Sequence, residues 1–147
     1  MGTSLSDATR TLGWEDVQTL LDASQDAAVS GGLRVVVAVV DRGGVLAGLL
    51  RHPETYLTSS SVAVAKAFTA ANFGASTGDL AERIPEETRA DLARVDGRLT
   101  FIRGGLPILR DGTVVGGVGV SGASAQQDAE VAEAAVSALD RRRRTGA

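Results

Sequence analysis

Lys66 is the only lysine among the 15 cationic side chains of this chain, and all the others are arginines. It lies in the apolar, alanine-rich stretch 61–73. A lysine ammonium is a compact charge whose pKa falls readily on burial, whereas an arginine guanidinium stays charged. Two interpretations follow, and both stay open at this point. Lys66 is either an amine that acts on a ligand or substrate, or a buried cation paired with one carboxylate.

The segment that carries Lys66 has the pattern of a helix. Thr58 and the serines that follow it can cap its N-terminus, and Gly74 can end it after residue 72. Lys66 and Phe68 belong to two different apolar faces of this helix. We therefore expect protein to cover the helix on two sides.

The rest of the chain alternates between helical and strand patterns. The expected elements are a helix over 14–30, strands over 33–40 and 45–51 joined by a four-residue loop, helical pieces over 77–92, strands over 99–102, 106–110 and 113–121, and a last helix over 124–141. This order predicts an α+β fold, a five-stranded antiparallel sheet with helices on both faces. We expect one domain over 14–141, a flexible arm at 1–13 and a basic tail at 142–147.

The composition argues against several classes of protein. A net charge of −3 disfavours a nucleic-acid-binding protein, which would carry a basic face. The chain has no cysteine, so it has neither disulfides nor a cysteine-based metal site, and its one histidine cannot form a multi-histidine centre. No apolar run reaches the roughly 18 residues of a membrane span, and the N-terminus lacks a signal-peptide pattern. We therefore expect a cytoplasmic protein that does not enter the membrane.

Residues 117–122 match GxGxxG, a pattern typical of dinucleotide-binding loops. Such a site requires a parallel strand after the next helix, but here that helix is the last element and the preceding strand belongs to a hairpin. The glycines are therefore expected to let a helix or strand approach the sheet closely. Ser121 and Gly122 precede a helix N-terminus, which indicates either an anion-binding site or a simple cap at Ser124.

Arg51 and His52 stand at the end of the second expected strand, directly before Pro53. As the only imidazole of the chain, His52 is a candidate metal ligand, for haem iron above all, and the alternative is a surface histidine without a role. Arg51 is a candidate partner for the carboxylates of a ligand. The basic run 141–144 suits a helix C-terminus and is expected to be solvated.

Four segments together resemble one known family. They are 41–46 (DRGGVL), 64–71 (VAKAFTAA), 103–108 (RGGLPI) and 111–128 (DGTVVGGVGVSGASAQQD). In combination they are similar to the GlcG/HbpS-like haem-binding domain family, a domain also appended to some cobalamin adenosyltransferases. The resemblance implies a profilin/roadblock-like fold of α-β-α layers, assembly as a homo-oligomer and binding of haem or another tetrapyrrole. Some members of the family degrade haem, so the resemblance makes haem degradation a further expectation.

The resemblance also implies which residues form the pocket. They are Lys66, Gly104, Gly105, Pro107, Ser121, Gly122 and Asp128. It makes Asp128 the expected partner of Lys66, and both are candidate catalytic residues. The chain departs from the family's pattern at 51–53 and at 84–96, where a planar ligand would be held.

Three functions remain open from the sequence. The first is a homo-oligomer that binds haem or another tetrapyrrole, with Arg51 or Lys66 meeting its propionates. The second is a cofactor-independent enzyme of the isomerase or lyase type on a small molecule, in which Lys66 acts as base, imine former or oxyanion stabiliser. The third is a scaffold domain without catalytic activity.

Overall fold

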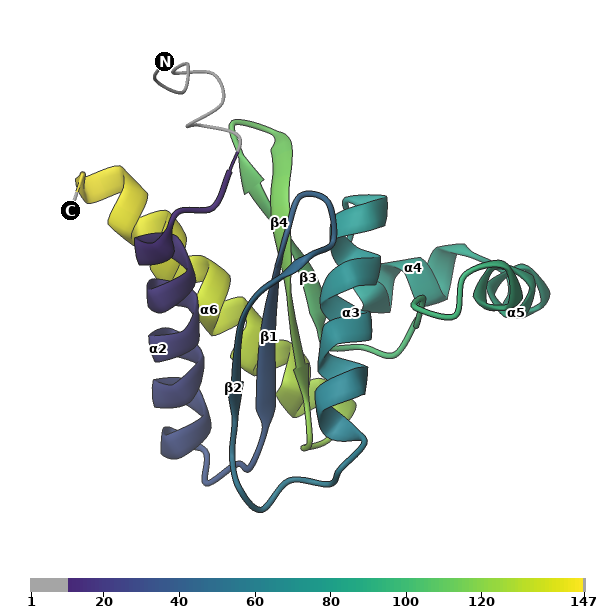
Figure 1. Cartoon of the computed structure of the whole chain (residues 1–147), viewed down its shortest axis with the longest axis horizontal. Coiled ribbons are helices and arrows are strands. Elements are labelled where there is room, and N and C mark those ends of the chain that lie inside the picture. The colour runs from purple at the N-terminus through teal and green to yellow at the C-terminus, as the bar shows by residue number, and fades with distance from the viewer. Residues whose placement is uncertain (1–10, 147) are drawn as a thin grey trace.

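Within residues 11–146, which the computed structural model describes, a sheet of four antiparallel strands forms the middle layer, with helices on both faces (Figure 1). In chain order the elements are α2 (Trp14–Ser30), β1 (Val36–Asp41), β2 (Leu46–Arg51), α3 (Ser59–Phe73), α4 (Thr77–Arg83), α5 (Glu86–Val95), β3 (Gly105–Arg110), β4 (Thr113–Ser121) and α6 (Ala125–Thr145). The strands lie in the order β2-β1-β4-β3. Residues 1–10 of the expected arm lie outside the described part.

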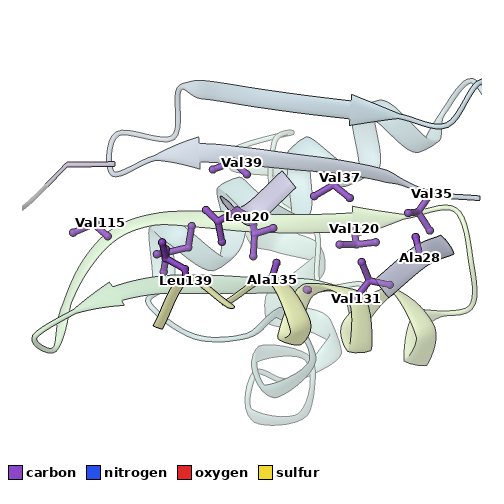
Figure 2. Packing of buried hydrophobic residues seen from close by; sticks show 13 residues of the cluster. Leu20, Ala28, Val35, Val37, Val39, Val115, Val120, Val131, Ala135 and Leu139 are labelled. Carbon is purple, nitrogen blue, oxygen red and sulfur yellow. The ribbon is translucent and has the colours of Figure 1, made fainter. Parts of the chain in front are cut away.

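The central strand β1 is buried on both faces, which explains its continuous run of apolar residues. Because side chains alternate along a strand, Val37 faces α2 and α6, where it packs in one cluster with Leu20 and Leu139 (Figure 2). Val36 faces the other way and packs against Ala63 of α3. This contact covers the sheet-facing side of α3, one of the two sides that the sequence predicted to be covered.

The glycines of β4 bring α3 close to the sheet. A Cβ added at Gly117 would overlap the carbonyl oxygen of Ala67, and one at Gly119 would overlap that of Ala63. These overlaps confirm the expectation that the glycine-rich strand serves close packing. As a result, the helix that carries Lys66 lies close to β4 at Gly117 and Gly119, where the strand has no side chain.

The expectation of a fifth strand at 99–102 is wrong. Instead of joining a ladder, the N–H of Thr100 donates to Oγ1 of Thr69 in α3, 2.9 Å away. The ring of Phe101 packs at 6.2 Å from that of Phe73. The apolar residues that suggested a strand therefore anchor a loop onto α3.

The last helix runs to Thr145 and includes the basic run that was expected to follow it as a solvated tail. Arg142 forms ion pairs with Glu15 and Asp16 at the start of α2, at 2.5 and 3.3 Å, so this arginine ties the two helices together. The expectation of a solvated run therefore does not hold for Arg142, because the acidic first turn of α2 lies beside the end of α6, whereas Arg141 and Arg144 are exposed. None of the described helices is long and apolar enough to cross a lipid bilayer.

Candidate functional site

Lys66 lies near the middle of α3 and points at the end of β4, with 1% of its surface exposed. Its Nζ donates to the carbonyl oxygen of Val120 at 2.7 Å and to Oδ2 of Asp128 at 3.1 Å. The other oxygen of Asp128 accepts the N–H of Ala123 at 3.0 Å, which fixes the carboxylate at the start of α6. The pairing of Lys66 with Asp128 is therefore present in the structure, as the resemblance implied.

Two glycines enclose this ion pair. Gly104 has a φ of +131°, and a Cβ there would lie 2.7 Å from both Nζ of Lys66 and the carbonyl oxygen of Val120. At Gly105 a Cβ would overlap the backbone carbonyl of Lys66, and the Gly105 N–H donates to Oγ1 of Thr77 at 3.0 Å. Residues 104 and 105 must therefore be glycine so that the 103–106 segment can close over the amine.

Burial lowers the pKa of Lys66 from its ordinary value of 10.5, and the attraction of Asp128 opposes this shift. Removing two charges from water is expensive, and their mutual attraction offsets that loss only when the geometry is good. The pair here also has a backbone acceptor and a backbone donor, which satisfy both partners further. A buried ion pair with these additional hydrogen bonds is typical of a structural salt bridge.

The described residues form several cavities, four of which have volumes of about 450, 160, 250 and 370 Å³. Lys66 and Asp128 line none of these four. The cavity of about 250 Å³ is the one of these four that adjoins the ion pair, because Gly104 and Gly105, which enclose the pair, also line this cavity between α4 and β3. The glycine turn thus separates the amine from this space.

The largest of the four cavities lies between α3 and β2, and we call it the α3–β2 groove. Its volume is about 450 Å³, and Leu49, Val64, Ala65 and Phe68 form its apolar wall. The guanidinium of Arg98 lies 4.2 Å from the centre of the Phe68 ring, a cation–π contact. The groove therefore combines an apolar wall with a guanidinium at its side, and Asp96 binds Nε and Nη2 of this guanidinium at 3.0 and 2.8 Å.

His52 and Arg51 line a separate cavity of about 160 Å³ between α2 and β2. Nδ1 of His52 accepts the N–H of Glu54 at 3.1 Å, so in the neutral ring the proton is on Nε2. A metal bound at Nε2 would require that proton to move to Nδ1, and the bond to Glu54 would be lost. Arg51 donates to the carbonyl oxygen of Thr55 at 3.2 Å, so it is also tied to its own loop.

The start of α6 is filled by its own side chains. Oγ of Ser124 accepts the N–H of Gln127, and the Gln127 side chain accepts that of Ser124, both at 3.1 Å. Together with the Ala123–Asp128 bond, this capping box confirms the simple cap and leaves the anion interpretation of 121–124 without support.

The structure places the remaining expected residues at different distances from the ion pair. Ser121 and Gly122 directly follow Val120, the acceptor of Lys66, at the end of β4. Pro107 lies on the edge strand β3, opposite Gly117. Of the expected residues, Lys66, Asp128, Gly104 and Gly105 form one cluster around the ion pair, and Ser121 and Gly122 are next to it in the chain.

Sequence reasoning missed the α3–β2 groove. Its walls come from β2, α3 and the loop after α5, and the residues are ordinary core and surface types. Arg98 follows Asp96-Gly97, which reads as a turn and nothing more. No pattern in the sequence could have shown that this arginine lies over Phe68.

An antiparallel sheet between helical layers, with a sealed ion pair on α3 and a ligand-sized groove beside it, defines an α+β domain with room for a small molecule. The family described as "Haem degrading protein HbpS-like" matches residues 12–137, and the chain belongs to this family. The predicted membership in the GlcG/HbpS-like family is thereby confirmed.

The corrinoid adenosyltransferase PduO of Salmonella typhimurium is 32% identical to this chain over 131 residues. The match covers 88% of this chain but 39% of PduO, so the chain spans well under half of that relative.

Two solved structures are similar along most of the chain. A complex of PduOC with haem has a TM-score of 0.81 and 31% identity, over 87% of this chain and 94% of that one. A double mutant of HbpS from Streptomyces reticuli has a TM-score of 0.80 and 33% identity, over 95% of this chain and 90% of that one. The α+β fold with an antiparallel sheet is therefore shared with HbpS.

Proposed function

We propose that this protein binds haem or another tetrapyrrole in the α3–β2 groove. The observation that carries the proposal is the groove itself, an apolar space of about 450 Å³ with a cation at its side, in a chain of the HbpS-like family. The similar PduOC structure is a haem complex, which supports the choice of ligand class. Haem degradation would be an additional activity of the same site.

The groove fits a large, flat, apolar ligand better than the cavity beside His52 does. Pockets that hold drug-sized ligands have volumes of about 300–1,000 Å³. The α3–β2 groove falls in this range, whereas the α2–β2 cavity, at about 160 Å³, falls below it. Val64 and Phe68 would contact the ring system. Asp96 already binds Nε and Nη2 of Arg98, so the Nη1 side of this guanidinium would face a propionate.

Titration with haemin tests the proposal, with the Soret band as the readout. Ala65→Trp places a large side chain in the groove, and we expect at least a tenfold loss of haemin affinity. Ala90→Trp, an exposed position on α5, is the control that adds the same bulk elsewhere and keeps wild-type affinity. Equal affinity in the two variants would exclude the groove as the binding site.

His52 can be tested in the same titration. Because its Nδ1 already accepts the Glu54 N–H, we propose that His52 does not ligate the iron. His52→Ala should then keep both the affinity and the position of the Soret band. A shifted band or a large loss of affinity in this variant would show that the 52–54 loop rearranges and that His52 is a ligand.

We also propose that the chain assembles as a homo-oligomer through β2. The two edges of the sheet differ, because β3 carries Pro107, which lacks an N–H, while β2 exposes Leu46, Leu49 and Leu50. An edge strand with exposed leucines and little charge is one that another strand can cover. Proline in β3 protects the other edge.

The mass in solution tests this assembly. Leu46→Lys should lower the mass measured by light scattering to that of a monomer, because a lysine at an edge opposes strand pairing. Leu109→Lys, an exposed leucine of similar accessibility on β3, should keep the wild-type mass. A wild-type mass in both variants would mean that β2 is not the interface.

The catalytic alternative has one observation in its favour, the lowered pKa of Lys66, since a less basic amine is a better nucleophile at neutral pH. The enclosure of Nζ by Gly104, Val120 and Asp128 opposes it. We infer that Lys66 has a structural role. Borohydride treatment with a small carbonyl compound should then leave Lys66 unmodified, and an adduct on its amine would restore the catalytic interpretation.

A further inference from the structure

A cluster of arginines lies at the other end of β4 from Lys66, where the last turns of α6 meet the β3–β4 hairpin. A cavity of about 370 Å³ is lined there by Leu109, Arg110, Asp111, Asp140, Arg143 and Arg144, and we call it the arginine cavity. Arg110 is opposite Thr113, seven residues before Val120 on β4. At about 3.3 Å per residue, the arginine cavity and the Lys66 cluster are roughly 23 Å apart.

Arg143 is the unusual member of this cluster. Its Nη1 donates to the carbonyl oxygen of Leu109 at 3.1 Å. Its Nε and Nη2 atoms are buried, and among the residues that the structure describes neither has a hydrogen-bond partner. A buried charged group with unmade hydrogen bonds is destabilising, and such groups are rare in folded proteins.

The two atoms without a partner are a matched pair. Nε and Nη2 lie on the same edge of the planar guanidinium, and this edge presents two parallel N–H groups to one carboxylate or phosphate. Arg98 in the same molecule uses these two atoms to bind the oxygens of Asp96, at 3.0 and 2.8 Å. Arg143 therefore has an edge that suits an oxyanion.

The acidic groups around the cavity do not fill this edge. Asp16 binds Arg110 at 3.1 Å and Arg142 at 3.3 Å. Asp140 attracts Arg143 electrostatically but makes no hydrogen bond to the buried nitrogens of Arg143. Arg110 repels Arg143. Burial is the main cause of the lowered pKa of Arg143, followed by Arg110.

We propose that the arginine cavity binds a small phosphate, either inorganic phosphate or the phosphate group of a phosphoester, on the Nε–Nη2 edge of Arg143. A phosphate fits better than a single carboxylate, because the three arginines of the cavity outnumber its two carboxylates, Asp111 and Asp140, and the net positive charge favours the more highly charged anion. Since both nitrogens are buried, binding requires the long side chain of Arg143 to turn this edge toward the cavity. The site is separate from the α3–β2 groove and does not depend on tetrapyrrole binding.

Calorimetric titration and thermal unfolding of the full chain test the site, at constant ionic strength in a buffer without phosphate. The probes are inorganic phosphate, glycerol phosphate and acetate. We expect saturable binding of at least one phosphate, a rise in the unfolding temperature with its concentration, and much weaker binding of acetate. A preference between the two phosphates identifies the source of the ligand.

Two matched variants assign the binding to Arg143. Arg143→Lys keeps the positive charge but loses the two parallel N–H groups of Nε and Nη2, and phosphate should bind at least tenfold more weakly. Arg94→Lys makes the same change at an exposed arginine of α5 that already pairs with Asp91, and it should bind phosphate as the wild type does. Binding that does not saturate, acetate binding as tight as that of phosphate, or equal affinity in Arg143→Lys and wild type would each overturn the proposal.

Discussion

Lys66 and Arg143 are two cations on helices, both with a pKa lowered mainly by burial, but they differ in what surrounds the charge. Lys66 has a carboxylate and a backbone carbonyl as acceptors, and a glycine turn closes over it. Arg143 has one backbone acceptor, and two of its nitrogens have none among the described residues. A buried cation whose hydrogen bonds are all made within its own chain supports the fold, whereas one with two buried nitrogens unbonded among the described residues has the chemistry to bind a ligand.

The largest effect should come from breaking the Lys66 pair. Lys66→Met leaves the buried carboxylate of Asp128 without its cation, and removing one partner of a buried pair typically costs about 3–5 kcal/mol. We expect a loss of this size in the free energy of unfolding, measured with urea. A loss below about 1 kcal/mol would contradict a structural role, since it is the size found for exposed pairs.

The glycine that covers the amine should have the next largest effect. Gly104→Ala adds a Cβ 2.7 Å from Nζ of Lys66 at a φ of +131°, so the change combines steric overlap with backbone strain. We expect a loss of about 1–3 kcal/mol in the free energy of unfolding. Gly97→Ala, with no atom within 4 Å of the added Cβ, is the control and should stay within about 0.5 kcal/mol of the wild type.

The lowered pKa of Lys66 gives a third, smaller effect, a dependence of stability on pH. Between the folded pKa and the unfolded value of 10.5, the unfolded chain binds more protons, so the free energy of unfolding rises with pH. The burial penalty is fully present below the folded pKa and is relieved as pH rises through it. The slope is at most about 1.4 kcal/mol per pH unit.

Urea unfolding between about pH 7 and pH 10 measures this slope, which Lys66→Met should lack. The difference between the slopes of the wild type and of Lys66→Met reports on one lysine, because the chain has no other. A wild-type slope equal to that of the variant would mean that burial does not shift the amine.

How far the sequence predicts this molecule depends on whether a feature is local or arises from packing. The hairpin at Asp111-Gly112 and the close packing of Gly117 depend on local patterns, and both were predicted. The partner of Lys66 came from family resemblance, since a separation of 62 residues gives no local signal. The α3–β2 groove and the edge of Arg143 depend on which atoms meet in space, and no residue pattern contained them.

The smallest effect should come from Arg143, and it separates the two cations most clearly. Arg143→Met removes a charge whose Nε and Nη2 make no hydrogen bond to described residues, while the aliphatic part of the side chain is retained. The lost bond to the Leu109 carbonyl and the relief of the buried charge oppose each other. We therefore expect a change of less than about 1 kcal/mol without phosphate, against the several kcal/mol of Lys66→Met.

Adding phosphate should make the wild type more stable than Arg143→Met, because a ligand stabilises only the form that binds it. Urea unfolding of both proteins with and without phosphate measures the difference. If Arg143→Met is as destabilising as Lys66→Met in the absence of phosphate, then Arg143 has partners that support the fold, and the contrast between the two cations does not hold.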